Sequence, residues 1–266
     1  MEVEIEASHH EASPGQHEID FRYEPALHAA DNIMTFKLAV KTIAKRHGMH
    51  ATFMPKPKSG VSGSGMHINM SLRKDGRNIF ADETDRFGLS QDAYYFIGGL
   101  MKHVYSMTAI TNPLVNSYKR LVSGFEAPLH IAWSVTNRSP LIRIPSSFGS
   151  GTRIELRSPD SAANPYLTIA LCLAAGLDGI KNKITPPENI QKNIFHMTEQ
   201  EKEQLHIKSL PTNLYDAVCA MERDAFIREI LGEHISNVYI GSKKDEWDRY
   251  CKTVTEWEVD TYLDKF

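Results

Sequence analysis

Carboxylates, histidines and arginines recur on the polar side of several alternating segments, and such side chains suit metal-dependent chemistry on an anionic substrate. Glu11 and Glu18 flank the turn sequence Ala-Ser-Pro-Gly, which can bring both carboxylates to one cation. Oxygen ligands without sulfur favour Mg²⁺ or Mn²⁺. The run His9-His10-Glu11 also fits a loop that holds no ligand. A zinc hydrolase is disfavoured because the sequence contains no His-Glu-x-x-His motif.

Two further segments carry residues that could act on an anion. The sequence Gly63-Ser-Gly-Met-His67 allows backbone to approach a ligand closely and sets His67 at the start of a strand. It is not a phosphate-binding P-loop, since no Gly-Lys-Ser/Thr follows. Guanidinium groups grip carboxylates and phosphates in bidentate fashion, and a group of arginines lies close to Glu126 and Glu155; these are Arg120, Arg138, Arg143, Arg153 and Arg157. Each signal alone also fits turn glycines, a solvated strand or surface salt bridges.

The elements that must position these residues follow from hydrophobic periodicity. Period-two alternation predicts strands over residues 3–7, 17–23, 66–72, 129–135, 141–144 and 152–156. Helical spacing and capping signals predict helices over 25–47, 90–108, 165–181 and 212–231, a capping box at 198–201 and a helical tail over 235–266. The predicted fold class is α+β, with a curved, mostly antiparallel sheet forming the catalytic face, helices packed on it and a helical C-terminal third.

Composition excludes several classes of protein. The chain has 266 residues with 30 Lys and Arg against 33 Asp and Glu, a net charge of −3 that argues against a nucleic-acid binder. No apolar stretch is long enough for a membrane span, and the acidic, alternating N-terminus is no secretory signal. The chain has 3 cysteines and no Cys-x-x-Cys motif, which favours free thiols in the cytoplasm and no zinc cluster.

Five segments carry an ordered set of motifs that extends over essentially the whole chain. They are Glu11-Ala-Ser-Pro-Gly-Gln-His-Glu18, Gly63-Ser-Gly-Met-His67, the stretch 116–128, the stretch 137–145 and Arg153-Ile-Glu-Leu-Arg-Ser-Pro-Asp160. In this order they resemble the motifs of bacterial type I glutamine synthetase. The resemblance implies ATP- and Mg²⁺-dependent joining of L-glutamate and ammonium through γ-glutamyl phosphate. It also implies a cytoplasmic dodecamer with active sites between neighbouring subunits, and it leaves room for a regulatory protein partner.

The resemblance implies a role for each matching residue. It makes Glu11 and Glu18 ligands of one metal ion, and His67 and Glu155 ligands of a second. Glutamate binding is implied for Arg120, Glu126, Arg138, Arg157 and the Ser62-Gly63 backbone. ATP binding is implied for Glu6, Asn69, Ser71, Arg138 and Arg143. The implied catalytic residues are Arg138, Arg157 and Glu126, the last of which lies on a flap that binds ammonium and shields the acyl phosphate from water.

The sequence departs from the family pattern at two points. Position 62 is Ser where the family commonly has Asn or another residue, and a backbone contact tolerates this difference. The family's upstream Glu-x-Glu strand and its N-terminal β-grasp domain have no counterpart in residues 1–266, so we expect an incomplete catalytic domain that alone is inactive or weakly active. Two alternatives stay open: a ligase of the same fold that joins glutamate to a polyamine or another amine, and a non-catalytic fragment that acts through assembly or regulator binding.

Overall fold

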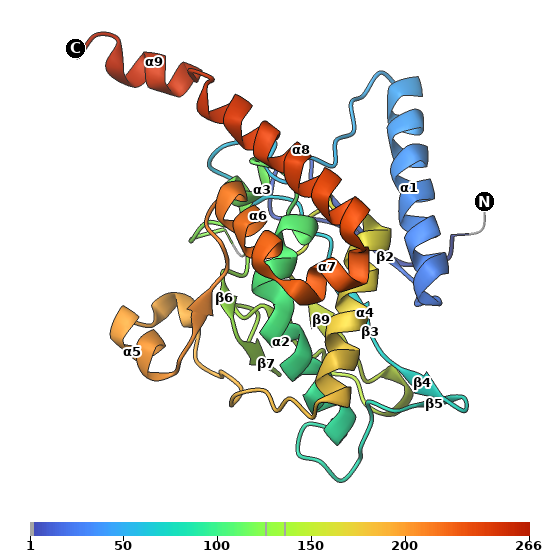
Figure 1. The fold of residues 1–266 in the computed structure, drawn as a ribbon. Helices are drawn as coiled ribbons and strands as arrows, with labels where there is room; N and C mark the ends of the chain where they lie inside the picture. The colour runs from blue at the N-terminus through green and yellow to red at the C-terminus, as the bar shows by residue number, and fades with distance from the viewer. Residues whose placement is uncertain (1–2, 126, 136) are drawn as a thin grey trace.

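The computed structural model describes residues 3–125, 127–135 and 137–266 and contains helices together with several small sheets (Figure 1). The first half holds β1 (Ile5–His10), β2 (His17–Phe21), α1 (Ala26–Arg46), β3 (Ile68–Met70), β4 (Arg73–Lys74), β5 (Arg77–Asn78), α2 (Gln91–Thr111) and α3 (Ser117–Arg120). Next come β6 (His130–Ile131), β7 (Trp133–Ser134), β8 (Ile142–Arg143), β9 (Ile154–Leu156) and α4 (Pro165–Lys181). The C-terminal part holds α5 (Glu199–Gln204), β10 (Lys208–Ser209), α6 (Leu214–Arg223), α7 (Ala225–Leu231), α8 (Glu233–Cys251) and α9 (Glu256–Tyr262). The expected α+β class is confirmed.

The four-stranded sheet has the order β3-β9-β8-β7. Strand β9 lies between β3 and β8 and is antiparallel to both, whereas β7 and β8 run parallel. The register sets Glu155 of β9 opposite Asn69 on one side and Arg143 on the other. Cross-strand partners project from the same face of a sheet, so this register brings an amide, a carboxylate and a guanidinium together.

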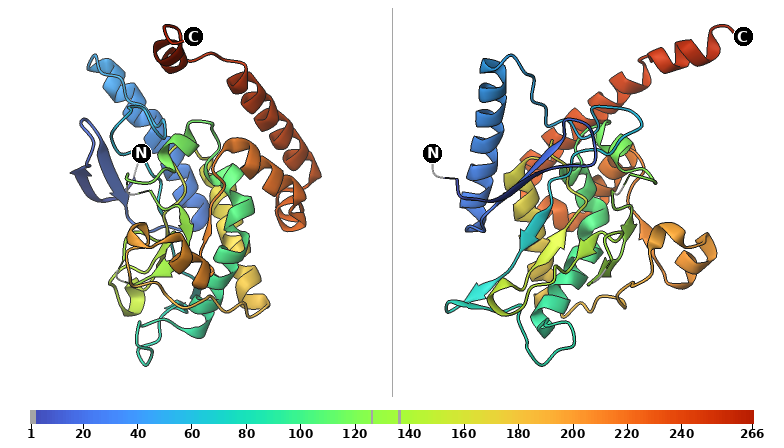
Figure 2. Two further views of the ribbon diagram at one scale, coloured as in Figure 1. Left: turned by 90° about the vertical axis from the view of Figure 1, so that its left-hand side faces the viewer. Right: turned by 180° about the vertical axis from the view of Figure 1, so that it is seen from behind.

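The hairpin β1–β2 forms a sheet of its own, as do the pairs β4–β5 and β6–β10. The strands predicted from alternation therefore belong to separate small sheets instead of one continuous sheet. The hairpin lies beside α1 (Figure 2), and Phe21 of β2 packs edge-on against Phe36 of α1 with ring centroids 5.0 Å apart. That contact fixes the hairpin, and with it Glu11 and Glu18, to the body of the protein.

Helices α2 and α4 pack at the centre of the core, where small residues let their backbones approach closely. An added Cβ at Gly99 would lie 2.1 Å from the Ala175 carbonyl oxygen, and one at Gly179 would lie 2.0 Å from the Tyr95 carbonyl oxygen. Leu100, Met107 and other fully buried side chains of α2 complete the core that supports the sheet.

Three predicted elements are interrupted in the structure. The segment 129–135 divides into β6 and β7, which belong to different sheets. The helix predicted over 212–231 breaks at Asp224, whose carboxylate accepts hydrogen bonds from the backbone N–H groups of Phe226 and Ile227 and so begins α7. The C-terminal tail breaks before Thr255, which forms a capping box with Glu258 and starts α9.

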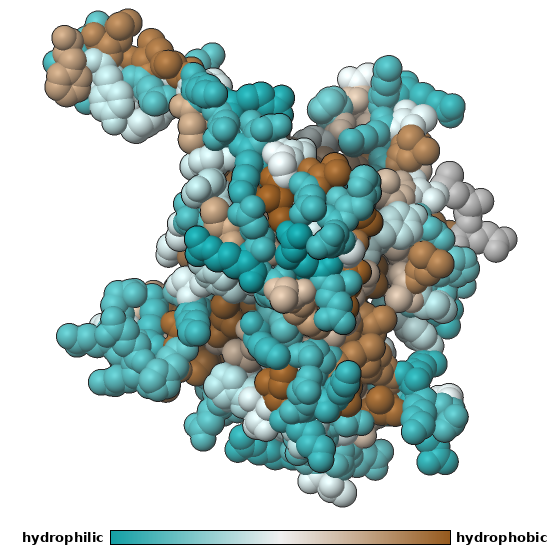
Figure 3. Space-filling model, in the orientation of Figure 1, coloured by the Kyte–Doolittle hydropathy of each residue, from teal (hydrophilic) through white to brown (hydrophobic). Residues whose placement is uncertain are grey.

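Helix α9 extends away from the body at the end of α8 (Figures 1 and 3). Trp257, Leu263 and Phe266 on this arm are 63%, 73% and 103% exposed. Clustered apolar side chains of this kind mark a contact surface. Among the described residues, no helix combines the length and apolar character needed to cross a membrane.

Candidate active site

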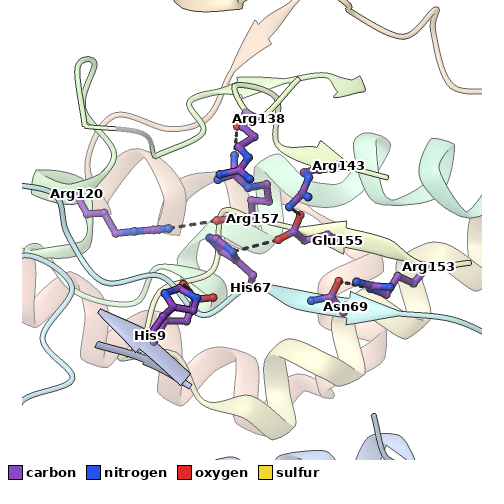
Figure 4. Close-up of polar contacts among 10 residues, drawn as sticks. His9, His67, Asn69, Arg120, Arg138, Arg143, Arg153, Glu155 and Arg157 are labelled. Atoms are coloured by element: carbon purple, nitrogen blue, oxygen red, sulfur yellow. Dashed lines mark hydrogen bonds and ion pairs between the residues drawn. The ribbon is translucent and has the colours of Figure 1, made fainter. Parts of the chain in front are cut away.

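His67, Glu155 and Arg143 meet on one face of the four-stranded sheet (Figure 4). One carboxylate oxygen of Glu155 lies 3.2 Å from His67 Nδ1, and the other accepts a hydrogen bond of 3.0 Å from Arg143 Nη1. Glu155 itself is only 6% exposed. A buried carboxylate needs such partners, because an unpaired charge there would be strongly destabilising.

These surroundings set the protonation states that a metal site requires. Burial alone would raise the pKa of Glu155, but the hydrogen bond with His67 and the charges of His67, Arg143 and Arg157 hold it below its ordinary value. Burial, together with the nearby arginines, lowers the pKa of the His67 imidazole despite its bond to Glu155. At neutral pH the pair is therefore an ionised carboxylate and a neutral imidazole, the forms that bind metals.

The turn of the β1–β2 hairpin carries a second acidic cluster. Glu11 and Glu18 lie within hydrogen-bonding distance of each other, and this contact raises the pKa of Glu18 to about 7 while that of Glu11 falls below its ordinary value. Ligand atoms of His9, Glu18 and Asp20 lie within 4.8 Å of one another. Neither His9 nor Asp20 is among the ligands predicted from the sequence. His9 lies close to Glu18 because the two residues are partners in the β1–β2 register.

The two clusters are neighbours. His67 contributes to the lowered pKa of Glu11, and the turn between Glu11 and Glu18 is hydrogen-bonded through Ser13 and Gln16 to the loop that precedes His67. Together they offer carboxylate oxygens and imidazole nitrogens, the donor set that Mg²⁺ and Mn²⁺ accept. The contact with Glu11 that raises the pKa of Glu18 is a further sign of fit, because a cation between the two carboxylates would favour the ionised form of both. The described residues thus suit divalent cations.

Arg120 and Arg157 are both buried and donate hydrogen bonds to backbone carbonyl oxygens. Arg120 is 3% exposed, and its terminal nitrogens donate to the carbonyl oxygens of Ser158 at 2.7 Å and Arg157 at 3.2 Å. Burial lowers its pKa to about 10. Arg157 in turn donates to the carbonyl oxygen of Arg138. In this arrangement Arg120 holds the backbone that presents Arg157, while Arg138 is exposed on the loop above (Figure 4).

The glycine-rich loop is held by hydrogen bonds to its backbone and by one close approach that requires glycine. The Ser13 hydroxyl donates to the Ser62 carbonyl oxygen at 2.8 Å, and the Gln16 amide donates to the Gly63 carbonyl oxygen at 3.0 Å. A Cβ at Gly63 would lie 2.4 Å from the Pro55 carbonyl oxygen, which would displace the loop. The hairpin turn with Glu11 and the loop before His67 are therefore joined directly.

Three of the residues predicted to bind the nucleotide, Glu6, Asn69 and Ser71, lie on two separate parts of the chain. Asn69 is exposed on β3 and accepts a hydrogen bond of 3.2 Å from Arg153 Nε, and Ser71 follows on the same edge. Glu6 is exposed on the separate β1–β2 hairpin. The hydrogen bond to Asn69 also brings Arg153 to the β3 edge. Glu126 lies outside the described residues.

Comparison with known proteins identifies what this arrangement belongs to. The family profile described as "Glutamine synthetase, catalytic domain" matches residues 1–262. The chain belongs to this family. It is 58% identical over 266 residues to the glutamine synthetase of Clostridium saccharobutylicum and covers 60% of that protein. It is 56% identical over 266 residues to the glutamine synthetase of Staphylococcus aureus strain MW2, again covering 60%.

A relative from a different lineage and a solved structure agree. The glutamine synthetase of Methanosarcina mazei is 57% identical over 263 residues, 99% of this chain and 59% of that protein. A solved structure described as "GmaS/ADP complex-Conformation 1" superposes with a TM-score of 0.89 at 40% identity, covering 98% of this chain and 60% of that one. The chain thus spans about 60% of the length of these glutamine synthetases. The family resemblance inferred from the motifs is confirmed.

Proposed function

We propose that this chain carries the catalytic face of an enzyme that joins ammonium to L-glutamate at the expense of ATP and forms L-glutamine through γ-glutamyl phosphate. The observation that carries the proposal is the convergence of His67 and Glu155 with Arg143 and Arg157, beside the Glu11–Glu18 pair. Hard cation ligands next to guanidinium groups are what phosphoryl transfer from ATP to a carboxylate requires.

Each group has a role in this proposal. Glu11 and Glu18 hold one Mg²⁺ or Mn²⁺ ion, and His67 and Glu155 hold the other. The bound ions would neutralise negative charge on the phosphates. Arg143 is pre-oriented by Glu155, and with Arg138 it faces the phosphate that is transferred. Asn69, Ser71 and Glu6 contact the nucleotide.

The glutamate site lies on the other side of the transferred phosphate. Arg157 binds a glutamate carboxylate, with Arg138, Glu126 and the Ser62-Gly63 backbone beside it. Arg120 takes part chiefly by fixing the backbone of residues 157 and 158. Glu126 binds ammonium and helps to exclude water, which matters because an acyl phosphate hydrolyses readily.

Assembly and location follow the same proposal. The exposed apolar side chains of α9 support a homo-oligomer, which we propose to be a dodecamer in the cytoplasm, with a regulatory protein as a further partner. The net charge of −3 argues against nucleic acid as a partner.

The test is to supply the purified 266-residue chain with ATP, Mg²⁺, L-glutamate and ammonium, and to follow both glutamine and phosphate. We expect phosphate release that depends on glutamate, and glutamine that appears only when ammonium is present. The rate of glutamine formation by the 266-residue chain should be at least about tenfold below that of the C. saccharobutylicum enzyme. The reason is that residues 1–266 contain no counterpart of the family's Glu-x-Glu strand, so fewer carboxylates hold the metal ions than in the family pattern. Phosphate release that ignores glutamate, without any glutamine, would overturn the proposal. A rate within tenfold would overturn the reasoning on metal ligands alone.

A further inference from the structure

Lys56 is a buried lysine whose contacts join two loops at the proposed glutamate site. Lys56 as a whole is 9% exposed. Its ammonium group donates to the carbonyl oxygen of Val61 and lies 3.7 Å from the centre of the Phe125 ring. Lysines are seldom buried unless their charge has a specific partner. The face of an aromatic ring is such a partner for an ammonium group.

The backbone of Lys56 is held as firmly as its side chain. The Asn116 side-chain amide pairs with it in both directions, accepting from Lys56 N–H at 2.8 Å and donating to the Lys56 carbonyl oxygen at 3.1 Å. The Ser64 backbone N–H donates to the Pro55 carbonyl oxygen at 2.8 Å. The backbone that carries the Lys56 side chain is therefore held in place beside the glycine-rich loop.

Phe125, at the other end of this connection, has a single backbone hydrogen bond among its described contacts, in which its carbonyl oxygen accepts from the Ala127 N–H at 2.8 Å. It is partly buried, but Val122, Ser123 and Gly124 just before it are exposed. Phe125 also directly precedes Glu126 in the chain. Contact with the Lys56 ammonium group is thus a means of holding the segment 121–125 against the loop 56–63.

We infer that Lys56 is a positioning residue that holds the segment 121–125 over the glutamate site through the ring of Phe125. This inference rests on the proposed function for the identity of the substrate, whereas the contact itself does not. The segment, held down, limits the access of water to a reactive acyl phosphate. Without the Lys56 contact, the segment 121–125 would order the glutamate site less well, whereas nucleotide binding would be unaffected.

Hydrogen exchange of the 266-residue chain tests the contact without any need for turnover. Lys56→Met keeps the length of the side chain and removes the charge, and we expect amides in 121–125 to exchange roughly five to ten times faster. Lys56→Arg should restore protection to within about twofold. Lys58→Met is the matched control, because the exposed Lys58 contacts only the Pro14 carbonyl oxygen among its described partners, at 3.3 Å, and it should leave exchange in 121–125 unchanged.

A double-mutant cycle shows whether the ring is responsible. Phe125→Leu keeps an apolar side chain without an aromatic face, and it should raise exchange as Lys56→Met does. Adding Lys56→Met to Phe125→Leu should then have little further effect on 121–125, since the interaction is already lost. The inference would be overturned if the increase in exchange rate in the double variant equalled the product of the two single increases. It would also be overturned if Lys56→Met left exchange in 121–125 unchanged.

Calorimetric titrations separate this inference from the proposed function. Lys56→Met should weaken binding of L-glutamate by roughly the same factor as it speeds exchange, and leave the affinity for ADP unchanged. Equal losses for both ligands would indicate general unfolding and overturn the positioning role. If the parent chain binds no glutamate, the proposed function fails, while the exchange data still decide whether Lys56 holds the segment 121–125.

Discussion

Gly179→Ala offers a sharp test of how the core supports the active site, because the structure predicts both its sign and its size. Alanine is the better helix former by about 1 kcal/mol, so on propensity alone the change would stabilise α4. The new Cβ, however, would lie 2.0 Å from the Tyr95 carbonyl oxygen and 2.7 Å from the backbone nitrogen of Gly99. These are backbone atoms, so no side-chain rotation relieves the overlap, and the two helices must move apart.

Overpacking of this kind costs about 3 kcal/mol or more. Set against the gain in helix propensity, the free energy of unfolding should fall by about 2 kcal/mol. For a domain of this size that corresponds to a Tm lower by roughly 4–8 °C. Gly241→Ala in α8 is the matched control, because its Cβ would meet nothing within 4 Å, and it should raise Tm slightly. Calorimetry on both variants checks the pair. A stabilised Gly179→Ala protein would refute the close approach of α2 and α4.

Two further changes probe the site and one local element. Arg157→Ala should weaken L-glutamate binding by roughly a hundredfold, because a buried charged hydrogen bond is lost, and should leave ATP affinity nearly unchanged. If calorimetric titrations give the variant and the parent chain the same affinity for glutamate, the assignment of Arg157 to the glutamate site is wrong. Asp224→Ala should lower the free energy of unfolding in urea by about 1 kcal/mol through loss of the α7 cap, whereas an unchanged midpoint would show that the cap is dispensable.

The sequence predicted the elements of the fold better than their partners. The helices that begin just after Pro25, Ser90 and Asn164 were recognisable because residues typical of helix N-termini and apolar spacing agree there. Alternation shows which face of a strand is polar but not which strand lies next to it, so the isolation of the β1–β2 hairpin was not predictable. The break at Asp224 was missed because apolar spacing continues across it.

The site follows the same distinction. His67 and Glu155 are polar residues of alternating segments, so a shared polar face for them could be inferred, whereas the place of Arg143 beside Glu155 depends on strand register. The burial of Arg120 beneath residues 157 and 158 depends on tertiary packing and leaves no trace in local sequence. His9 joins the acidic cluster through strand register, and Lys56 meets Phe125 from a distant part of the chain. Such contacts need the three-dimensional structure.

The central claim is that the two clusters around Glu18 and Glu155 bind divalent cations for phosphoryl transfer. The most direct measurement is anomalous diffraction from crystals of the chain soaked in MnCl₂, recorded at the manganese absorption edge. We predict one anomalous peak within about 2–2.6 Å of ligand atoms of Glu11 and Glu18, and a second at the same distance from His67 and Glu155. Manganese peaks elsewhere on the protein, with neither cluster occupied, would contradict the account.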